Sequence, residues 1–236
     1  MSNLGIYNDG TFNMNGGSIV SNGLASVGIY SESGNTDTNL KGGMIRAENG
    51  GIGLYAGNNS VINMHEGVTL SSGNKGLLFY NYDNSNVSGK YDITGTVDAA
   101  VENGGSAFYV KEGSTITDYL NNSFTGTGKL ELTMNSGSKL YILEGTGTTL
   151  NLSSLDGMVN PGSSLTNNVV ISSASASDYI PLSMNKGALV LDRNVSLDNN
   201  SELYKRSEFS SVKVDLLGGN SITGSQSNQT GIAQRN

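Results

Sequence analysis

Two glutamates and one arginine come closest to the acid–base machinery of an enzyme. Glu48 and Glu102 each stand directly before an asparagine turn, and Arg46 lies two residues before Glu48. Enzymes that cleave polysaccharides use clustered carboxylates. These two glutamates belong to sequence repeats two apart, about 10 Å at the spacing of neighbouring strands, and Gly73 stands at the position between them. We therefore interpret them as solvated turn charges and predict no catalytic residue.

Metal, cofactor and nucleic-acid sites are also not predicted. The segment Asp83–Asn86 offers oxygen ligands but lacks the spacing and final glutamate of a calcium loop. His65, the single histidine, has no serine and acid arranged around it and is interpreted as a surface residue. The chain has no cysteine, and its net charge of −7 provides no basic stripe for nucleic acid. No glycine motif joined to a helix suggests a bound cofactor.

Five regularly spaced tyrosines are the best candidates for a binding surface. Aromatic side chains bind sugars and the apolar surfaces of protein partners. The alternative interpretation is that stacked rings only stabilise neighbouring strands. A second candidate is the predicted loop Ser172–Asp178, because loops on a rigid scaffold often carry recognition. The five candidate binding residues are Tyr7, Tyr30, Tyr55, Tyr80 and Tyr109.

The tyrosines belong to a repeat that organises the chain. Asn49-Gly-Gly-Ile-Gly-Leu-Tyr55 recurs in degenerate form, and the tyrosine numbers increase in similar steps (30−7=23, 55−30=25, 80−55=25 and 109−80=29). Alternation predicts two inward rows on the first strand of each repeat. The tyrosines are then expected on the opposite face, in a column. The predicted inward rows are Leu4/Val27/Ile52/Leu77/Ser106 and Ile6/Ile29/Leu54/Phe79/Phe108.

Each repeat contains two further short strands. The second is predicted around Phe12–Met14, Asn39–Leu40, Val61–Met64 and Tyr91–Ile93, and the third around Ile19, Ile45, Leu70 and Val97, after a glycine turn. Three strands per repeat predict an all-β fold, a parallel β-helix (β-solenoid). A repeat of about 23–29 residues exceeds the roughly 18 of the left-handed, hexapeptide form. We therefore expect a right-handed parallel β-helix in which asparagines tolerate the left-handed turns and hydrogen-bond from repeat to repeat.

The chain divides into three expected segments. Residues 1–118 form the regular repeats, 119–220 form less regular ones with loop excursions, and 221–236 resume the pattern. Strands are predicted at 129–134, 138–143, 148–152, 187–191 and 211–217, and a short helix over Glu202–Glu208. Ser221–Ile232 repeats the spacing of Ser18–Ile29. Neither end resembles a polar cap, so both ends are expected to be cuts in a longer array.

Four segments resemble the passenger region of a large bacterial autotransporter adhesin of the fusobacterial kind. They cover Gly5–Ile19, Gly128–Leu140, Asp178–Asn194 and Arg206–Ser211, and the resemblance extends over nearly the whole chain. It implies a right-handed β-helix displayed on the cell surface, extracellular and anchored through a C-terminal outer-membrane β-barrel. This chain contains neither the barrel nor a signal peptide. The implied partners are proteins or glycans of host cells or other bacteria.

The sequence therefore favours a non-catalytic adhesin or stalk segment of an autotransporter passenger. The alternative is a pectin-lyase-like carbohydrate-active enzyme on the same fold, and a groove with two carboxylates about 5–9.5 Å apart beside a basic residue would favour it. A third interpretation is an inert spacer. Repeated weak contacts along a rigid rod would gain strength by multivalency.

Overall fold

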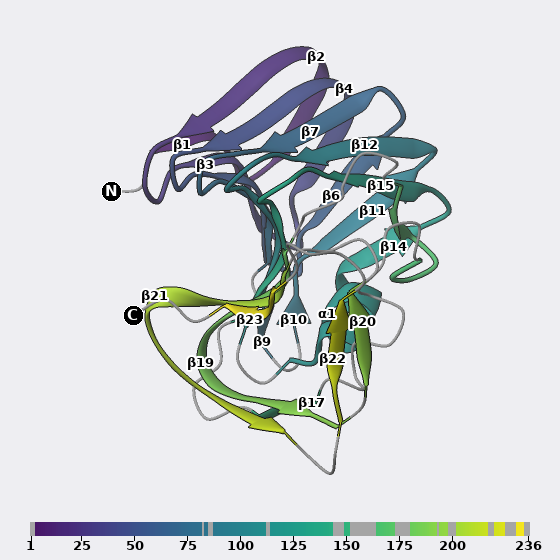
Figure 1. The fold of residues 1–236 in the computed structure, drawn as a ribbon. Coiled ribbons are helices and arrows are strands. Elements are labelled where there is room, and N and C mark those ends of the chain that lie inside the picture. The colour runs from purple at the N-terminus through teal and green to yellow at the C-terminus, as the bar shows by residue number, and fades with distance from the viewer. Residues whose placement is uncertain are drawn as a thin grey trace.

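In the part of the chain that the structure describes, two large parallel β-sheets and one short helix form the fold (Figure 1). This confirms the all-β, parallel class expected from the sequence. Figure 1 shows the strands of successive repeats stacked side by side. The computed structural model describes residues 3–81, 83–84, 87–111, 114–143, 149–151, 164–172, 180–192, 194–197, 202–216, 220–224 and 230–233.

The first sheet has ten strands and carries the tyrosine repeat. Its strands pair in the order in which they follow along the chain, and every pair is parallel. They are β1 (Leu4–Asn8), β3 (Val27–Ser33), β5 (Ile52–Asn58), β8 (Leu77–Asn81), β13 (Ser106–Val110), β16 (Lys139–Leu143), β19 (Ile180–Leu191), β21 (Glu202–Leu216) and β23 (Thr230–Ala233), with β17 (Thr149–Asn151) paired to β19.

The register of this sheet agrees with the predicted repeat over the first five strands. The tyrosine positions pair directly from β1 to β8, and Phe79 pairs with Phe108. The repeat length then leaves the expected range. Ser106 pairs with Lys139, which is a step of 33 along the chain (139−106), and Lys139 pairs with Ile180, a step of 41 (180−139). The predicted repeat length therefore fails between Ser106 and Ile180, whereas the pairing of Tyr204 with Ile232 returns to the expected range, with a step of 28 (232−204).

The second sheet has nine strands and divides along its length. The first half of β4 (Asp37–Glu48) pairs with β6 and the second half with β7. Strands β2 (Thr11–Asn22) and β4 continue past the glycine turn with a shift in register. The others are β6 (Val61–His65), β7 (Val68–Ser72), β11 (Lys90–Thr94), β12 (Thr96–Val101), β14 (Phe124–Gly126), β15 (Lys129–Met134) and β18 (Val169–Ile171).

The second and third strands of each repeat are thereby confirmed, with one difference. Ala99, not Val97, pairs with Leu70, because β12 begins two residues earlier in register than expected. Two small sheets complete the described strands. Strands β9 (Asp83–Asn84) and β10 (Val87–Ser88) pair antiparallel, and β20 (Val195–Leu197) pairs in parallel with β22 (Ile222–Gly224).

One predicted inward row is correct and the other is correct in part. Ile29, Leu54, Phe79 and Phe108 are fully buried in the core. In the row that begins with Leu4, the residues Val27, Leu77 and Ser106 are buried, although none of the row belongs to the hydrophobic cluster. Most of the residues between the two rows are buried as well. A Cβ on Gly28 would lie 3.4 Å from Ile19 Cγ2. The isoleucine of the third strand therefore occupies this space, and strict alternation fails.

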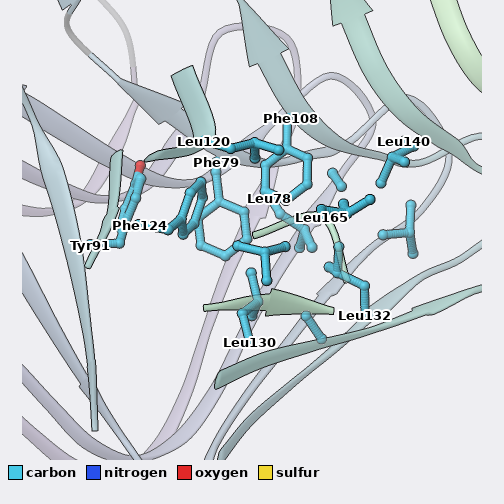
Figure 2. Packing of buried hydrophobic residues seen from close by; sticks show 14 of the residues in the cluster. Leu78, Phe79, Tyr91, Phe108, Leu120, Phe124, Leu130, Leu132, Leu140 and Leu165 are labelled. Carbon is cyan, nitrogen blue, oxygen red and sulfur yellow. The ribbon is translucent and has the colours of Figure 1, made fainter. Parts of the chain in front are cut away.

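Aromatic rings fill the middle of the core (Figure 2). Phe79 packs edge-on against Tyr91 and Phe124 at 4.9 and 5.2 Å between ring centroids, and stacks on Phe108 at 5.7 Å. The Tyr91 hydroxyl is fully buried and donates hydrogen bonds to the Leu54 and Tyr80 carbonyls at 3.1 and 3.0 Å. Burial raises the pKa of Tyr91 well above its ordinary value. This hydroxyl ties the first sheet to the second.

The helix prediction is wrong in position. The predicted helix Glu202–Glu208 lies within strand β21, which is paired with β19 and β23, and this pairing overrides local helix propensity. The described helix is α1 (Ile116–Ser123). Its N-cap Thr115 accepts a hydrogen bond from the Asp118 backbone N–H at 3.1 Å. Its buried residues include Tyr119 and Leu120, which belong to the core cluster.

The asparagine turns behave as predicted. Asn49 and Asn74 have positive φ angles of 52° and 41°. The Asn49 side-chain amide donates to the Asn22 side-chain oxygen at 2.7 Å, and the Asn74 amide donates to Asn49. A second row of hydrogen-bonded asparagines runs along the second sheet. Asn39 donates to Asn13 at 3.3 Å, and Asn63 donates to Asn39 at 3.0 Å.

Candidate binding surface: the tyrosine column

The five tyrosines form one continuous column on the outside of the first sheet. Successive ring centroids are 5.6, 4.6, 4.9 and 5.3 Å apart from Tyr7 to Tyr109. Neighbouring parallel strands lie about 4.8 Å apart, so the strand pairing sets this spacing. The predicted column is confirmed, whereas its role in binding stays a prediction.

The orientation of the rings determines which groups a partner would meet. Tyr30 is stacked between Tyr7 and Tyr55, with interplanar angles of 29° and 20°. The rings towards Tyr109 are tilted, at 54° and 39°. The inner rings therefore turn their faces mostly towards one another, which leaves their edges for a partner. Tyr7 ends the column and is 48% exposed.

Charged residues flank the column two positions after individual tyrosines. The Tyr7 hydroxyl is hydrogen-bonded to Glu32, which raises the pKa of Tyr7 to about 12. Burial and the Glu32 charge raise the pKa of Tyr30 as well. At the other end, the Lys111 ammonium lies 4.9 Å from the centroid of the Tyr80 ring, within the range of a cation–π interaction. The column is thus acidic at one end and basic at the other.

A buried polar network supports the column from behind. Asn8 donates to the Thr38 hydroxyl at 2.8 Å, and Thr38 donates to Ser31 at 3.0 Å. Ser31 and Thr36 share a further hydrogen bond of 2.7 Å. Asn8 and Ser31 directly follow Tyr7 and Tyr30, so these bonds fix the strands at the point where the rings emerge.

The carboxylates considered for catalysis form an ion-pair network instead. Arg46 Nη1 and Nη2 donate to the two Glu102 carboxylate oxygens at 3.0 and 2.8 Å, and Nε donates to Glu48 at 2.8 Å. Both carboxylates raise the pKa of Arg46. A Cβ at Gly73 would lie 3.2 Å from Glu102 Oε2, so glycine keeps the path between the repeats open. The two glutamates are therefore bound to arginine rather than independently solvated.

The remaining predicted sites have mixed outcomes. His65 lies in β6, partly buried and paired in register with Thr94. Asp83 and Asn84 form a short strand, whereas Ser85, Asn86 and most of the Ser172–Asp178 loop lie outside the described residues. Within the described ranges, no cluster of three or more potential metal ligands occurs. Helices long and apolar enough to span a membrane are likewise not found there.

Sequence reasoning overlooked the charges that flank the column. Asp9, Glu32 and Lys111 each stand two residues after a tyrosine of the column, so strand alternation could have placed them on the same face.

Comparisons with models of protein families, with curated proteins and with solved structures find no match.

Proposed function

We propose that this chain is a non-catalytic, β-helical binding and spacing segment of a bacterial surface adhesin. In this proposal the two sheets belong to a right-handed parallel β-helix, and the chain acts extracellularly as a rigid rod. The motifs similar to autotransporter passengers and the parallel register of successive repeats support it. Its partner is a protein or glycan on the surface of a host cell or another bacterium.

The tyrosine column is the observation that carries this proposal. It presents five phenol groups in one line, each fixed by strand pairing and four of them partly buried. Because neighbouring rings cover one another's faces, the partner meets ring edges and hydroxyl groups. Hydroxyl-rich glycans and extended protein backbones offer matching hydrogen-bonding groups. Each contact is weak, and several contacts along the line increase the total affinity.

Binding to a glycan array and to fixed epithelial and bacterial cells tests the proposal. A Tyr7→Phe/Tyr30→Phe variant keeps both rings and removes two hydroxyl groups from the column. If the column binds through its edges, this variant binds the same targets several-fold more weakly than the original chain. The matched control is Asn39→Ala, which removes a partly buried side chain from the other sheet.

Two outcomes would contradict the proposal. The first is that the original chain binds none of the glycans or cells, which would favour an inert spacer. The second is that the tyrosine variant and the Asn39→Ala control weaken binding equally. Melting curves of all three proteins separate loss of binding from loss of folding.

A further inference from the structure

One edge of the molecule exposes strands that contain no charged residue. β1 pairs only with β3, and β2 only with β4, among the described strands. Neither β1 nor β2 contains a charged residue. Among the residues whose burial the structure describes, the exposed large hydrophobic side chains lie near the N-terminal end of the chain: Leu4, Tyr7, Val20, Leu24 and Met44. An uncharged edge of this kind is a template for pairing with another strand.

The opposite edge of the same sheet repeats the pattern of β1 in register. The partners of Ile6 can be followed strand by strand through the whole sheet to Ile232 in β23: Ile6, Ile29, Leu54, Phe79, Phe108, Tyr141, Leu182, Tyr204 and Ile232. Thr230-Gly-Ile-Ala233 therefore occupies the register positions of Leu4-Gly-Ile-Tyr7. Among the described strands, β23 pairs only with β21.

Backbone contacts restrict which strand can precede β1. A Cβ on Gly5 would lie 2.6 Å from the Gly28 carbonyl oxygen of the next strand, and one on Gly28 would lie 2.7 Å from the Gly53 oxygen. A strand placed before β1 in the same register would approach the Gly5 carbonyl in the same way. At the close spacing of β1 and β3, glycine fits this position without a clash, and β23 provides Gly231. Further along the sheet, where the same row holds Leu78 and Ala107, the strands accommodate a side chain there.

We propose that β23 of one copy pairs in parallel with β1 of a second copy of this chain. Thr230, Gly231 and Ile232 then lie beside Leu4, Gly5 and Ile6 of the second copy. This contact joins two different edges, so it is heterologous and leaves one edge of each type free for further copies. The inference is independent of the proposed adhesion, because it uses strand edges rather than the outer face of the tyrosines.

Sedimentation velocity across a concentration series tests the proposal with two variants. Leu4→Lys places a charge on the β1 edge, at a residue that is 41% exposed. Gly231→Val introduces the expected clash with the Gly5 carbonyl of the second copy. The original chain is expected to form species that lengthen with concentration, and each variant alone is expected to remain monomeric. Gly10→Val is the control, because its Cβ would meet nothing within 4 Å.

Mixing the two variants distinguishes this arrangement from others. Leu4→Lys retains an intact β23 edge and Gly231→Val retains an intact β1 edge, so an equimolar mixture is expected to form dimers and nothing larger. A monomeric original chain would overturn the proposal. So would association that survives Gly231→Val, because the β23 edge would then not be the surface that binds β1. Circular dichroism of each variant, matched to the original chain, establishes that the monomers are folded.

Discussion

Arg46 shows how one side chain can link three successive strands. It extends from β4 past Ser71 on β7 to Glu102, which follows β12, and Gly73 leaves the space that its guanidinium needs. The bidentate geometry with Glu102 is the strong form of this interaction. The side chains are 28% and 42% exposed, so water and salt weaken the attraction.

Replacing Arg46 with glutamine is expected to lower the free energy of unfolding by about 1 kcal/mol, towards the upper end for partly exposed ion pairs. Chemical denaturation at low salt measures this difference, and high salt should reduce it. Lys41→Gln, an exposed position in the same strand, is the control. Equal effects of the two substitutions would contradict a specific role for the network.

The Tyr7–Glu32 hydrogen bond makes a prediction about ionisation. Glu32→Gln should return the pKa of Tyr7 from about 12 towards its ordinary value of 10. Because the pKa is raised in the folded state, the folded chain holds this proton more tightly. The associated stability is present below pH 10 and is lost as the pH rises towards 12. Phenolate absorbance during an alkaline titration, compared with a Tyr7→Phe variant, identifies the group.

At the scale of elements, the regular strands were predictable and the exceptions have physical causes. The recurring tyrosine motif and its asparagine turns place β1, β3, β5, β8 and β13 correctly. The segment Glu202–Glu208 was wrongly predicted as a helix because its composition suits one. Its pairing with β19 and β23 makes it a strand. Helix α1 had a usable signal: Thr115 stands before Ile116, Tyr119 and Leu120, which are spaced at helical intervals.

The N-cap of α1 can be tested directly. Thr115→Ala removes the acceptor for the Asp118 N–H and is expected to destabilise the fold by about 1 kcal/mol. Thr115→Ser keeps the hydroxyl and should retain most of the stability. Denaturation midpoints of the two variants are the measurement. If alanine and serine gave the same midpoint, the cap would not contribute to stability.

The candidate surface was only partly predictable. The tyrosine spacing predicts the column because equivalent residues of parallel strands must lie side by side. The angles between the rings depend on side-chain packing across several strands, and no spacing rule determines them. The hydrogen bonds from Arg46 to Glu102 were also not predictable from spacing. They depend on the small size of Gly73, which lies between the two side chains in space.

At the scale of the whole molecule, the two equal steps of 25 residues from Tyr30 to Tyr80 predict that one repeat can be removed. Deleting residues 49–73 joins Glu48 to Asn74, so the asparagine turn is retained and Tyr30 comes next to Tyr80. The shortened chain should fold with lower stability and a smaller denaturant m value, because less surface is buried. Deleting residues 49–60 is the control and should prevent folding, since it takes the rows out of register. Equal behaviour of both deletions would contradict the repeat.

The strand pairing also has a mechanical consequence. Each strand of the first sheet is held by hydrogen bonds to the strand of the next repeat, so a force that separates the chain ends peels strands away in sequence instead of shearing them together. Optical-tweezer traces should then show a series of small extensions. Releasing a regular repeat lengthens the tether by roughly 8 nm, the reach of about 25 extended residues. Under load the chain would therefore unfold one repeat at a time and dissipate energy in a series of small extensions.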